Sequence, residues 1–204
     1  MKIAIIDYGM GNIHSVAKAI GLYAGNPLVT NKKSDIISCD KIVLPGVGAF
    51  DDAMLELEKQ DLAGVIKDQI NQKKPFLGIC LGMQLLLENS QEAKSKKGLG
   101  IFKGQVIKFS DKCGQKIPHM GWNNLKVVAG ACPLLKGISD NSQVYFCHSY
   151  YPCPADKSVI AATCNYGLEF ACALWKDNVY GCQFHPEKSQ SVGLGIIKNF
   201  VQLC

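Results

Sequence analysis

The sequence predicts an α/β fold with a mixed, mostly parallel central sheet and an antiparallel extension. In the first half, short apolar segments alternate with helical segments, an order typical of a parallel sheet covered by helices. In the second half, short strand-like segments follow one another with only turns between them, which favours antiparallel pairing. With 204 residues and 48% hydrophobic content, the chain is expected to form a single domain over residues 1–204 with a sizeable core.

The first half supplies the parallel strands and their connecting helices. Residues 2–6 form a short apolar run that ends at a glycine-containing turn, the pattern of a buried strand. Apolar residues then recur at helical spacing from Ile13 onward. The expected elements are, in order, a strand at 2–6, a helix from 13, a strand at 41–44, helices at 51–59 and 61–73, a strand at 76–79 and a helix at 81–88.

The second half is expected to hold the antiparallel extension. It contains short segments rich in β-branched and aromatic residues, and turns separate them. Only the last segment returns to helical spacing. Strands are expected at 105–109, 125–128, 144–150, 159–164, 170–175 and 179–184, and a helix at 192–203.

The charge pattern excludes some functional classes. The formal net charge is +5, and all 22 basic side chains are lysines. Arginine is the usual side chain for bidentate recognition of guanine and phosphate, so its absence argues against nucleic acid as a partner. No apolar run approaches the ~20 residues of a membrane span. The apolar run near the N-terminus, Ile3–Ile6, is too short for a signal-peptide core. No membrane association is therefore expected.

The ten cysteines do not form a recognisable metal or disulfide framework. Their spacing is irregular and no C-x-x-C pair occurs, so we expect reduced thiols in a cytoplasmic protein. The four histidines are scattered, without an H-x-x-x-H or H-E-x-x-H pair. A G-x-x-x-x-G-K phosphate loop is also missing. The sequence therefore predicts neither a metal ion nor another cofactor.

Cys80 lies in the most informative segment of the chain. An apolar strand ends in Gly78-Ile79-Cys80-Leu81-Gly82, and a helical run follows at once. This is the thiol form of the G-x-S-x-G nucleophile elbow. The strand turns so sharply into the helix that the residues two positions before and two positions after the nucleophile must be glycine. The positive N-terminal end of the helix favours the reactive thiolate. The amide of Leu81 is expected to point toward a developing oxyanion. A structural cysteine in a buried turn is the alternative.

A nucleophilic cysteine needs a base, and His185 is the best candidate. It follows a predicted strand in the sequence His185-Pro186-Glu187, where Pro186 prevents a helix from continuing. In an extended chain, residues two apart point the same way, so Glu187 is expected beside His185. Glu187 would then fix the tautomer of the imidazole. His14 is expected to be structural or to lie at the surface.

A second glycine turn is expected near Cys80. Pro45-Gly46-Val47-Gly48 follows a predicted parallel strand, so it belongs at the same edge of the sheet as the elbow. Backbone amides without side-chain obstruction are good donors to an oxyanion. Read alone, the segment is an ordinary glycine turn.

Together these motifs resemble those of the class I (triad) glutamine amidotransferases. The segments Gly78–Gln84 and His185–Glu187 carry the resemblance to the superfamily. More narrowly, the whole chain resembles the glutaminase subunits of imidazole glycerol phosphate synthase, an enzyme of histidine biosynthesis. The narrower likeness is carried by residues 6–12, 45–50, 118–123, 145–152 and 185–190.

The resemblance implies a flavodoxin-like three-layer fold and a complete set of roles. Cys80 would attack the side-chain amide of L-glutamine, with His185 as base and Glu187 as its orienting group. The amides of Leu81 and of the Gly46, Val47 and Gly48 segment would form the oxyanion hole, and in this family that segment rearranges before it can donate. The positions matching the family's glutamine-binding residues are Gln84, Glu92, His148, Ser149 and Tyr150.

The resemblance also implies a partner protein. In this family the glutaminase forms a heterodimer with a (β/α)8-barrel cyclase, which receives the ammonia. The positions matching the partner interface are Trp122, Asn123, Tyr145 and Lys188, while His119 is either interfacial or structural. Two alternatives remain. Related glutaminases supply ammonia to sugar-aminating synthetases of surface polysaccharide biosynthesis, and a non-enzymatic flavodoxin-like binding module would leave Cys80 without a role.

Overall fold

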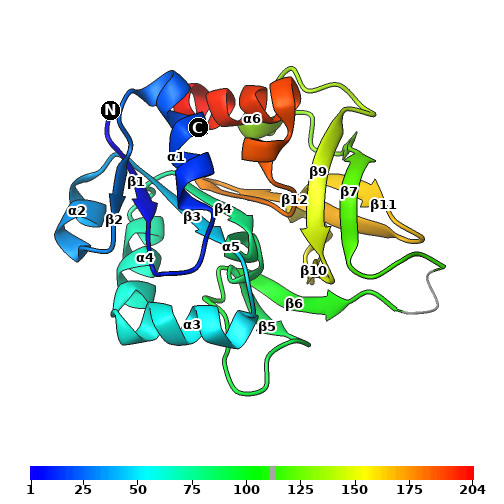
Figure 1. Ribbon diagram of the computed structural model, residues 1–204, viewed down its shortest axis with the longest axis horizontal. Coiled ribbons are helices and arrows are strands. Elements are labelled where there is room, and N and C mark those ends of the chain that lie inside the picture. Colours follow the sequence, from blue (N-terminus) through cyan, green and yellow to red (C-terminus); the bar gives the residue numbers. More distant parts are fainter. Residues whose placement is uncertain (111–113) are drawn as a thin grey trace.

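The computed structural model of the protein describes residues 1–110 and 114–204. Its main sheet has eight strands in the order β2-β1-β3-β4-β13-β12-β11-β8 (Figure 1). The first five are parallel to one another, while β12, β11 and β8 pair antiparallel. The expected mixed sheet with an antiparallel extension is therefore confirmed.

The strands and helices have the following bounds. The strands are β1 (Ile3–Ile6), β2 (Leu28–Thr30), β3 (Lys41–Gly46), β4 (Phe76–Cys80), β5 (Leu87–Ser90), β6 (Phe102–Lys108), β7 (His119–Asn124), β8 (Lys126–Val127), β9 (Gln143–His148), β10 (Tyr150–Pro154), β11 (Ile160–Asn165), β12 (Glu169–Lys176) and β13 (Val179–Cys182). The helices are α1 (Ile13–Ala24), α2 (Lys33–Ser38), α3 (Phe50–Lys59), α4 (Leu62–Asn71), α5 (Leu81–Gln84) and α6 (Gln190–Leu203).

The parallel sheet is buried on both faces, which is why its strands are continuous apolar runs. Along β1, Ile3 and Ile5 pack into the core beneath α1 and α6, while Ala4 and Ile6 pack into the core beneath α2, α3 and α4. Figure 1 shows these helices on opposite sides of the sheet. The period of two in a strand thus generates two cores and three layers.

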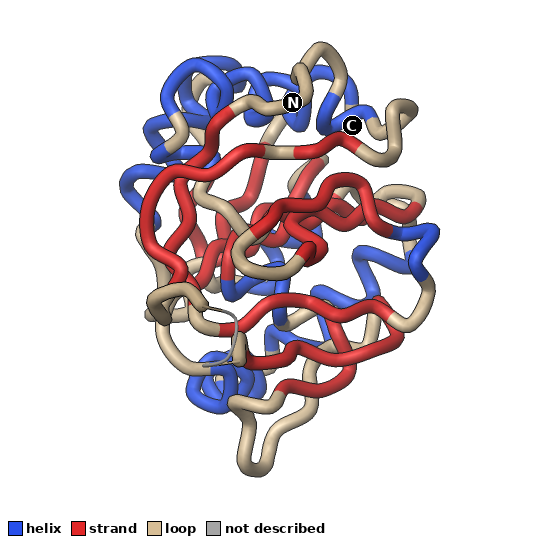
Figure 2. The backbone as a smooth tube through the Cα atoms, turned by 90° about the vertical axis from the view of Figure 1, so that its right-hand side faces the viewer, coloured by secondary structure: helices blue, strands red, loops and turns tan. Residues whose placement is uncertain are grey.

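Two smaller sheets extend the molecule beyond the carboxyl ends of β3 and β4. One has the order β10-β6-β5, and the other is the antiparallel ribbon β7-β9. Figure 2 turns the right-hand side of Figure 1, where β7 and β9 lie, toward the viewer. The aromatic ring of Phe170, on β12, contacts those of Phe109 and Phe146 between the ribbon and the main sheet. The ribbon therefore stands at one end of the fold on an aromatic core.

The structure corrects several expected elements. The helix expected at 81–88 ends at Gln84, and β5 begins at Leu87, whose partner is Phe102. The run from Leu85 to Leu87 is fully buried, and periodicity alone cannot separate a buried helix from a buried strand. The strand expected at 144–150 divides into two, which belong to different sheets. The elements missed from the sequence are β2, α2, β5, β7 and β10.

None of the described helices is long and apolar enough to cross a membrane.

Candidate active site

Cys80 is the last residue of β4 and sits at a sharp turn into α5. Its backbone has φ 55° and ψ −111°, a conformation that non-glycine residues rarely adopt. Such strain persists only where the surrounding structure enforces it, and it is typical of functional sites. The helix that follows is a single turn of four residues, shorter than expected, so its dipole contributes less than a long helix would.

The glycines around Cys80 are required by close backbone contacts. A Cβ atom on Gly82 would lie 1.9 Å from the carbonyl oxygen of Leu44, and one on Gly78 would lie 2.6 Å from that of Gly82. Neither position therefore tolerates a side chain without movement of the backbone. The steric reason for the G-x-C-x-G pattern is confirmed.

His185 and Glu187 lie together in the core beside Cys80. His185 Nδ1 donates a hydrogen bond of 2.9 Å to Glu187 Oε1, and the two side chains are 4% and 1% exposed. Cys80 and His185 line the same pocket, and Cys80 is one of the groups that raise the pKa of the imidazole. A thiol, an imidazole and a carboxylate thus form a line from the elbow into the interior.

The expected contact between His185 and Glu187 is present, but the backbone that carries it is not extended as expected. Residues Pro186–Lys188 form a turn of 3₁₀ helix rather than an extended chain. The proline occupies the first position of this turn, where an N–H group would have no hydrogen-bond partner within the turn. Glu187 reaches His185 because the turn folds the chain back on itself.

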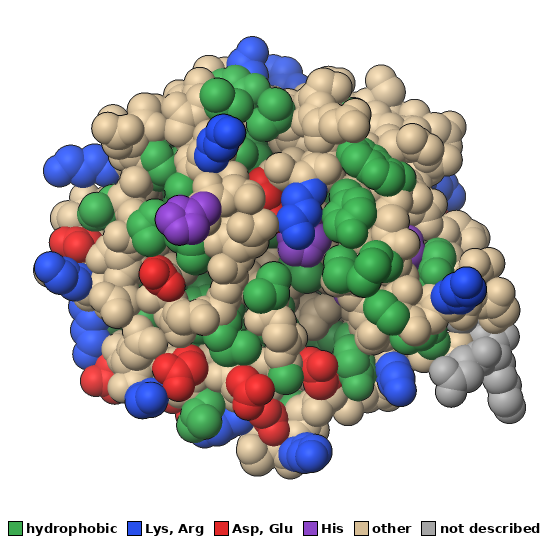
Figure 3. Space-filling model, in the orientation of Figure 1, with side chains coloured by type: hydrophobic (Ala, Val, Ile, Leu, Met, Phe, Trp, Pro, Cys, Tyr) green, Lys and Arg blue, Asp and Glu red, His purple; other side chains and the backbone are tan. Residues whose placement is uncertain are grey.

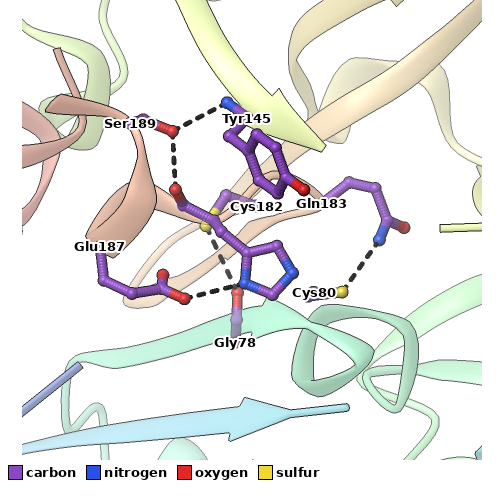
Figure 4. Close-up of polar contacts among 8 residues, drawn as sticks. Gly78, Cys80, Tyr145, Cys182, Gln183, Glu187 and Ser189 are labelled. Atoms are coloured by element: carbon purple, nitrogen blue, oxygen red, sulfur yellow. Dashed lines mark hydrogen bonds and ion pairs between the residues drawn. The ribbon is translucent and has the colours of Figure 1, made fainter. Parts of the chain in front are cut away.

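Hydrogen bonds to β9 fix this turn. The amide of His185 donates to the carbonyl of Tyr145 at 2.9 Å, and the buried hydroxyl of Ser189 donates to the carbonyl of His185 at 2.6 Å. The same hydroxyl accepts from the amide of Tyr145 at 2.9 Å (Figure 4). The backbone of the imidazole residue is therefore tied to the β7-β9 ribbon.

The surroundings of His185 favour its protonated form. Burial alone lowers the pKa of the imidazole, but hydrogen bonds to Cys80 and Glu187 and the negative charges of these groups outweigh burial and raise the pKa to about 10. A carboxylate behind an imidazole stabilises its cation. The arrangement can therefore hold an imidazolium against a thiolate.

Cys80 opens into a pocket of about 320 Å³. The pocket brings together segments from across the chain, since β4, the loop after β3 and the end of β9 all meet there. The lining residues that the sequence singled out are Val47, Gly48, Cys80, Leu81, Gln84, Glu92, His148, Ser149, Tyr150, His185 and Lys188. Glu187 lies behind His185, outside this lining.

The two backbone segments expected to bind an oxyanion flank the nucleophile. Gly46 pairs with Cys80 in the β3–β4 register, and Val47 and Gly48 continue to the pocket wall. Gly46 is buried, and a Cβ atom there would lie 2.6 Å from the hydroxyl of Tyr8. Glycine at this position therefore lets β3 approach the elbow closely.

Gln84 and Glu92 stand in the same pocket with different environments. The amide Nε2 of Gln84 donates to the carbonyl of Tyr150 and to Gln183 Oε1. Glu92 accepts from the amide of Phe50 at the start of α3. Burial, the largest cause, raises the pKa of Glu92, and the Phe50 amide opposes that rise. Glu92 is a partly buried carboxylate that faces a cavity.

Three of the four residues assigned to the partner interface form one cluster. Trp122 and Tyr145 face each other across the β7-β9 ribbon with ring centroids 6.1 Å apart, and Lys188 Nζ lies 5.8 Å from the Tyr145 ring. Figure 3 shows hydrophobic side chains gathered over this ribbon, where Met120 is 60% exposed and Trp122 is 44% exposed. Asn123 points to the other side of β7, toward His119 and the carbonyl of Asn165.

The other three histidines lie in different surroundings. His119 and His148 are buried and hydrogen-bonded to each other, and His14 is exposed on α1. Two residues near the site were missed from the sequence, Ser189 and Gln183. Gln183 is fully buried, and its Nε2 lies 3.7 Å from Cys80 Sγ. No motif or spacing rule singles out either side chain.

Comparison with known proteins identifies the family of the chain. The sequence model of the family "Glutamine amidotransferase class-I" matches residues 4–203. A protein from Methanococcus maripaludis, named imidazole glycerol phosphate synthase subunit HisH 1, is 53% identical over 98% of this chain and 99% of its own length. A subunit HisH from Geobacter sulfurreducens is 49% identical over 99% of both chains.

Solved structures share the fold at lower identity. The structure of PurLQS from Thermotoga maritima matches with a TM-score of 0.77 at 18% identity, over 98% of this chain and 96% of the other. The glutaminase domain of CTPS from Trypanosoma brucei matches with a TM-score of 0.67 at 17% identity, over 98% and 93%. A full-length family match, close relatives and an elbow cysteine beside a buried histidine lead to one conclusion: the chain belongs to the class I glutamine amidotransferase family.

Proposed function

We propose that this protein hydrolyses L-glutamine to glutamate and ammonia through a Cys80–His185–Glu187 triad. The observation that carries the proposal is the buried His185–Glu187 hydrogen bond, with His185 and the elbow cysteine lining the same pocket. Cysteine nucleophiles are activated by an adjacent imidazole that a third group orients.

The chemistry has two halves. The Cys80 thiolate attacks the side-chain amide carbon, and the carbonyl oxygen becomes an oxyanion. The imidazolium of His185 gives its proton to the amide nitrogen, ammonia leaves, and a glutamyl thioester remains. Neutral His185 then takes a proton from water, whose oxygen attacks the thioester and releases glutamate and the thiolate. Glu187 holds the imidazole in the required tautomer and balances its charge.

The oxyanion would be held by the backbone amide of Leu81 and by the segment Gly46–Gly48. Both border the pocket next to Cys80, which supports this role. Substrate glutamine would bind against Gln84, Glu92 and the residues 148–150. The carboxylate of Glu92 suits the α-ammonium group, since it is partly buried and faces the cavity.

We further propose that the ammonia passes to a (β/α)8-barrel cyclase as part of a cytoplasmic imidazole glycerol phosphate synthase. The names of the close relatives support this acceptor over a sugar-aminating synthetase. The cluster of Trp122, Tyr145 and Lys188 is suited to the interface, because exposed aromatic residues are enriched at such surfaces. Tyr145 of this cluster lies on β9, and its carbonyl accepts a hydrogen bond from the amide of His185. A partner that docks on the cluster would therefore contact the strand that positions the base.

The test is a glutamine hydrolysis assay with and without the cyclase and its nucleotide ligand. The chain alone is expected to be slow, and addition of both components should raise the rate of glutamate formation strongly. Cys80→Ala should abolish the stimulated rate while leaving the complex intact. Stimulated hydrolysis by Cys80→Ala would refute the nucleophile, whereas an unchanged rate on adding the cyclase would refute the partner.

A further inference from the structure

Gln183 contacts the nucleophile from the side opposite to the triad's carboxylate. It follows β13, is fully buried, and its Nε2 lies 3.7 Å from Cys80 Sγ (Figure 4). Neither the elbow motif nor the H-P-E motif includes it. A buried amide must satisfy both of its ends, so the orientation of this side chain has a cause that can be traced.

The orientation of Gln183 follows from a group that can only accept. The carbonyl of Tyr150 accepts from Gln84 at 3.0 Å, so the end of Gln84 that faces it must be the amide nitrogen. The same nitrogen lies 2.9 Å from Gln183, so the near end of Gln183 must be its oxygen. Its nitrogen is therefore left to face the sulfur.

A second donor holds the same carbonyl in place. His148 Nδ1 donates to the carbonyl of Tyr150 at 2.7 Å, which leaves His148 Nε2 as an acceptor. His119 Nδ1 fills that acceptor at 3.0 Å. Burial lowers the pKa of His148 to about 3, so the neutral form that this scheme requires is the stable one at neutral pH. The carbonyl that orients Gln84 is thus fixed from two sides.

We propose that Gln183 is a further catalytic residue, whose Nε2–H donates to the Cys80 thiolate and aims the sulfur, and that Gln84 is the positioning residue that orients it. The proposal rests on Cys80 being the nucleophile. Hydrogen bonds to a charged acceptor favour the charged form, and both Gln183 and Cys80 are buried. This donor supplements the short helix α5, whose single turn gives the thiolate limited help from its dipole.

The experiment measures the rate of alkylation of Cys80 by iodoacetamide as a function of pH. Peptide-resolved mass spectrometry separates Cys80 from the other nine cysteines. Gln183→Glu keeps the shape and the acceptor toward Gln84 but presents a carboxylate to the sulfur. The midpoint pH of alkylation should rise by at least about one unit, and the rate at pH 7 should fall about tenfold. The readout does not require turnover, so it stands even if the proposed glutaminase activity fails.

The matched control is Gln105→Glu, which makes the same change at an exposed position of β6. It should alkylate as the wild type does. Gln183→Met, which removes the donor without adding a charge, should shift the midpoint in the same direction by less. This apolar variant also covers the case in which Gln183→Glu does not fold. Wild-type midpoints for both variants, or for the one that folds, would overturn the contact with the sulfur.

Gln84→Glu tests the orientation separately. A carboxylate at position 84 cannot donate to Tyr150 or to Gln183 Oε1, so the amide of Gln183 should turn its oxygen to the sulfur. The midpoint pH should then rise although residue 84 does not touch Cys80. A wild-type midpoint for Gln84→Glu beside a shifted one for Gln183→Glu would overturn the role of Gln84.

Discussion

Glu187 carries the charge on which the proposed chemistry depends most. It accepts from His185 Nδ1 in a site that is almost fully buried, and it helps to raise the pKa of the imidazole. Glu187→Gln keeps the shape but can donate to Nδ1, which favours the wrong tautomer. The kcat of glutamine hydrolysis in the partner complex should fall roughly 10²- to 10⁴-fold, with a smaller change in KM. Glu58→Gln, on the exposed side of α3, should retain the wild-type kcat. A wild-type kcat for Glu187→Gln would remove it from the triad.

The His119–His148 pair makes a prediction about acid stability. Burial lowers the pKa of His119 to about 4 and that of His148 to about 3, while an unfolded histidine titrates near 6.5. Below pH 6.5 the unfolded chain therefore binds protons that the folded chain rejects, and the free energy of unfolding should decrease as the pH falls toward 4. His185 has a raised pKa, so its contribution to the free energy of unfolding changes with pH in the opposite direction. This contribution is fully present below pH 6.5 and is lost as the pH rises toward 10.

Urea unfolding between pH 7 and 4 checks this prediction. His119→Asn keeps a donor toward His148 but cannot be protonated, so its stability should depend less steeply on pH than that of the wild type. His14→Asn, on the exposed face of α1, should keep the wild-type slope. Equal slopes for all three proteins would contradict the account of the buried pair.

Among the elements, the turn from β4 into α5 is the most constrained by sterics. Gly82→Ala would place a Cβ atom 1.9 Å from the carbonyl oxygen of Leu44, so it should destabilise the fold by about 3 kcal/mol or more. Gly64→Ala makes the same change on α4, where the new methyl group meets nothing within 4 Å. It should stabilise the fold by about 0.5–1 kcal/mol. Chemical denaturation of both variants measures the difference, and equal effects would contradict the proposed close contact.

The elements that the sequence predicted well are those whose pattern has a local cause. β1, β3 and β4 are apolar runs between glycine-containing turns, and α3 and α4 have helical spacing, so each was found within a few residues. β7 was missed because its sequence, with Gly121 and two asparagines, has weak strand propensity and is held by pairing with β9. The helix after Cys80 is shorter than predicted because a buried apolar run fits either structure.

In the candidate site, too, residues that belong to a local motif were predicted and residues that act through distant contacts were not. Cys80, His185 and the glycine turn were recognisable because each carries a local motif, and the resemblance to a family added the pocket residues. Gln183 and Ser189 were not recognisable, since their importance arises from contacts between segments far apart in the chain. The His185–Glu187 contact was predicted for the wrong reason. We expected an extended chain, but residues Pro186–Lys188 form a 3₁₀ turn, and the sequence does not distinguish the two.

At the scale of the whole molecule, the β7-β9 ribbon connects the proposed docking face with the site. Trp122→Ala should weaken binding of the cyclase roughly 30-fold, because large aromatic residues are frequent hot spots of interfaces. The stability of the free chain should change little, since Trp122 is 44% exposed. Leu55→Ala, at an exposed position of α3, serves as the control. Titration of the partner measures both affinities, and equal values would place the interface elsewhere.

The central claim is that Cys80 carries the glutamyl group during hydrolysis. The most direct measurement is rapid acid quench of the partner complex during turnover of isotope-labelled glutamine, followed by mass spectrometry of the peptides. The account predicts a glutamyl thioester on the peptide that contains Cys80 and none in Cys80→Ala. A labelled adduct on another residue, or glutamate formation at the wild-type rate by Cys80→Ala, would contradict it.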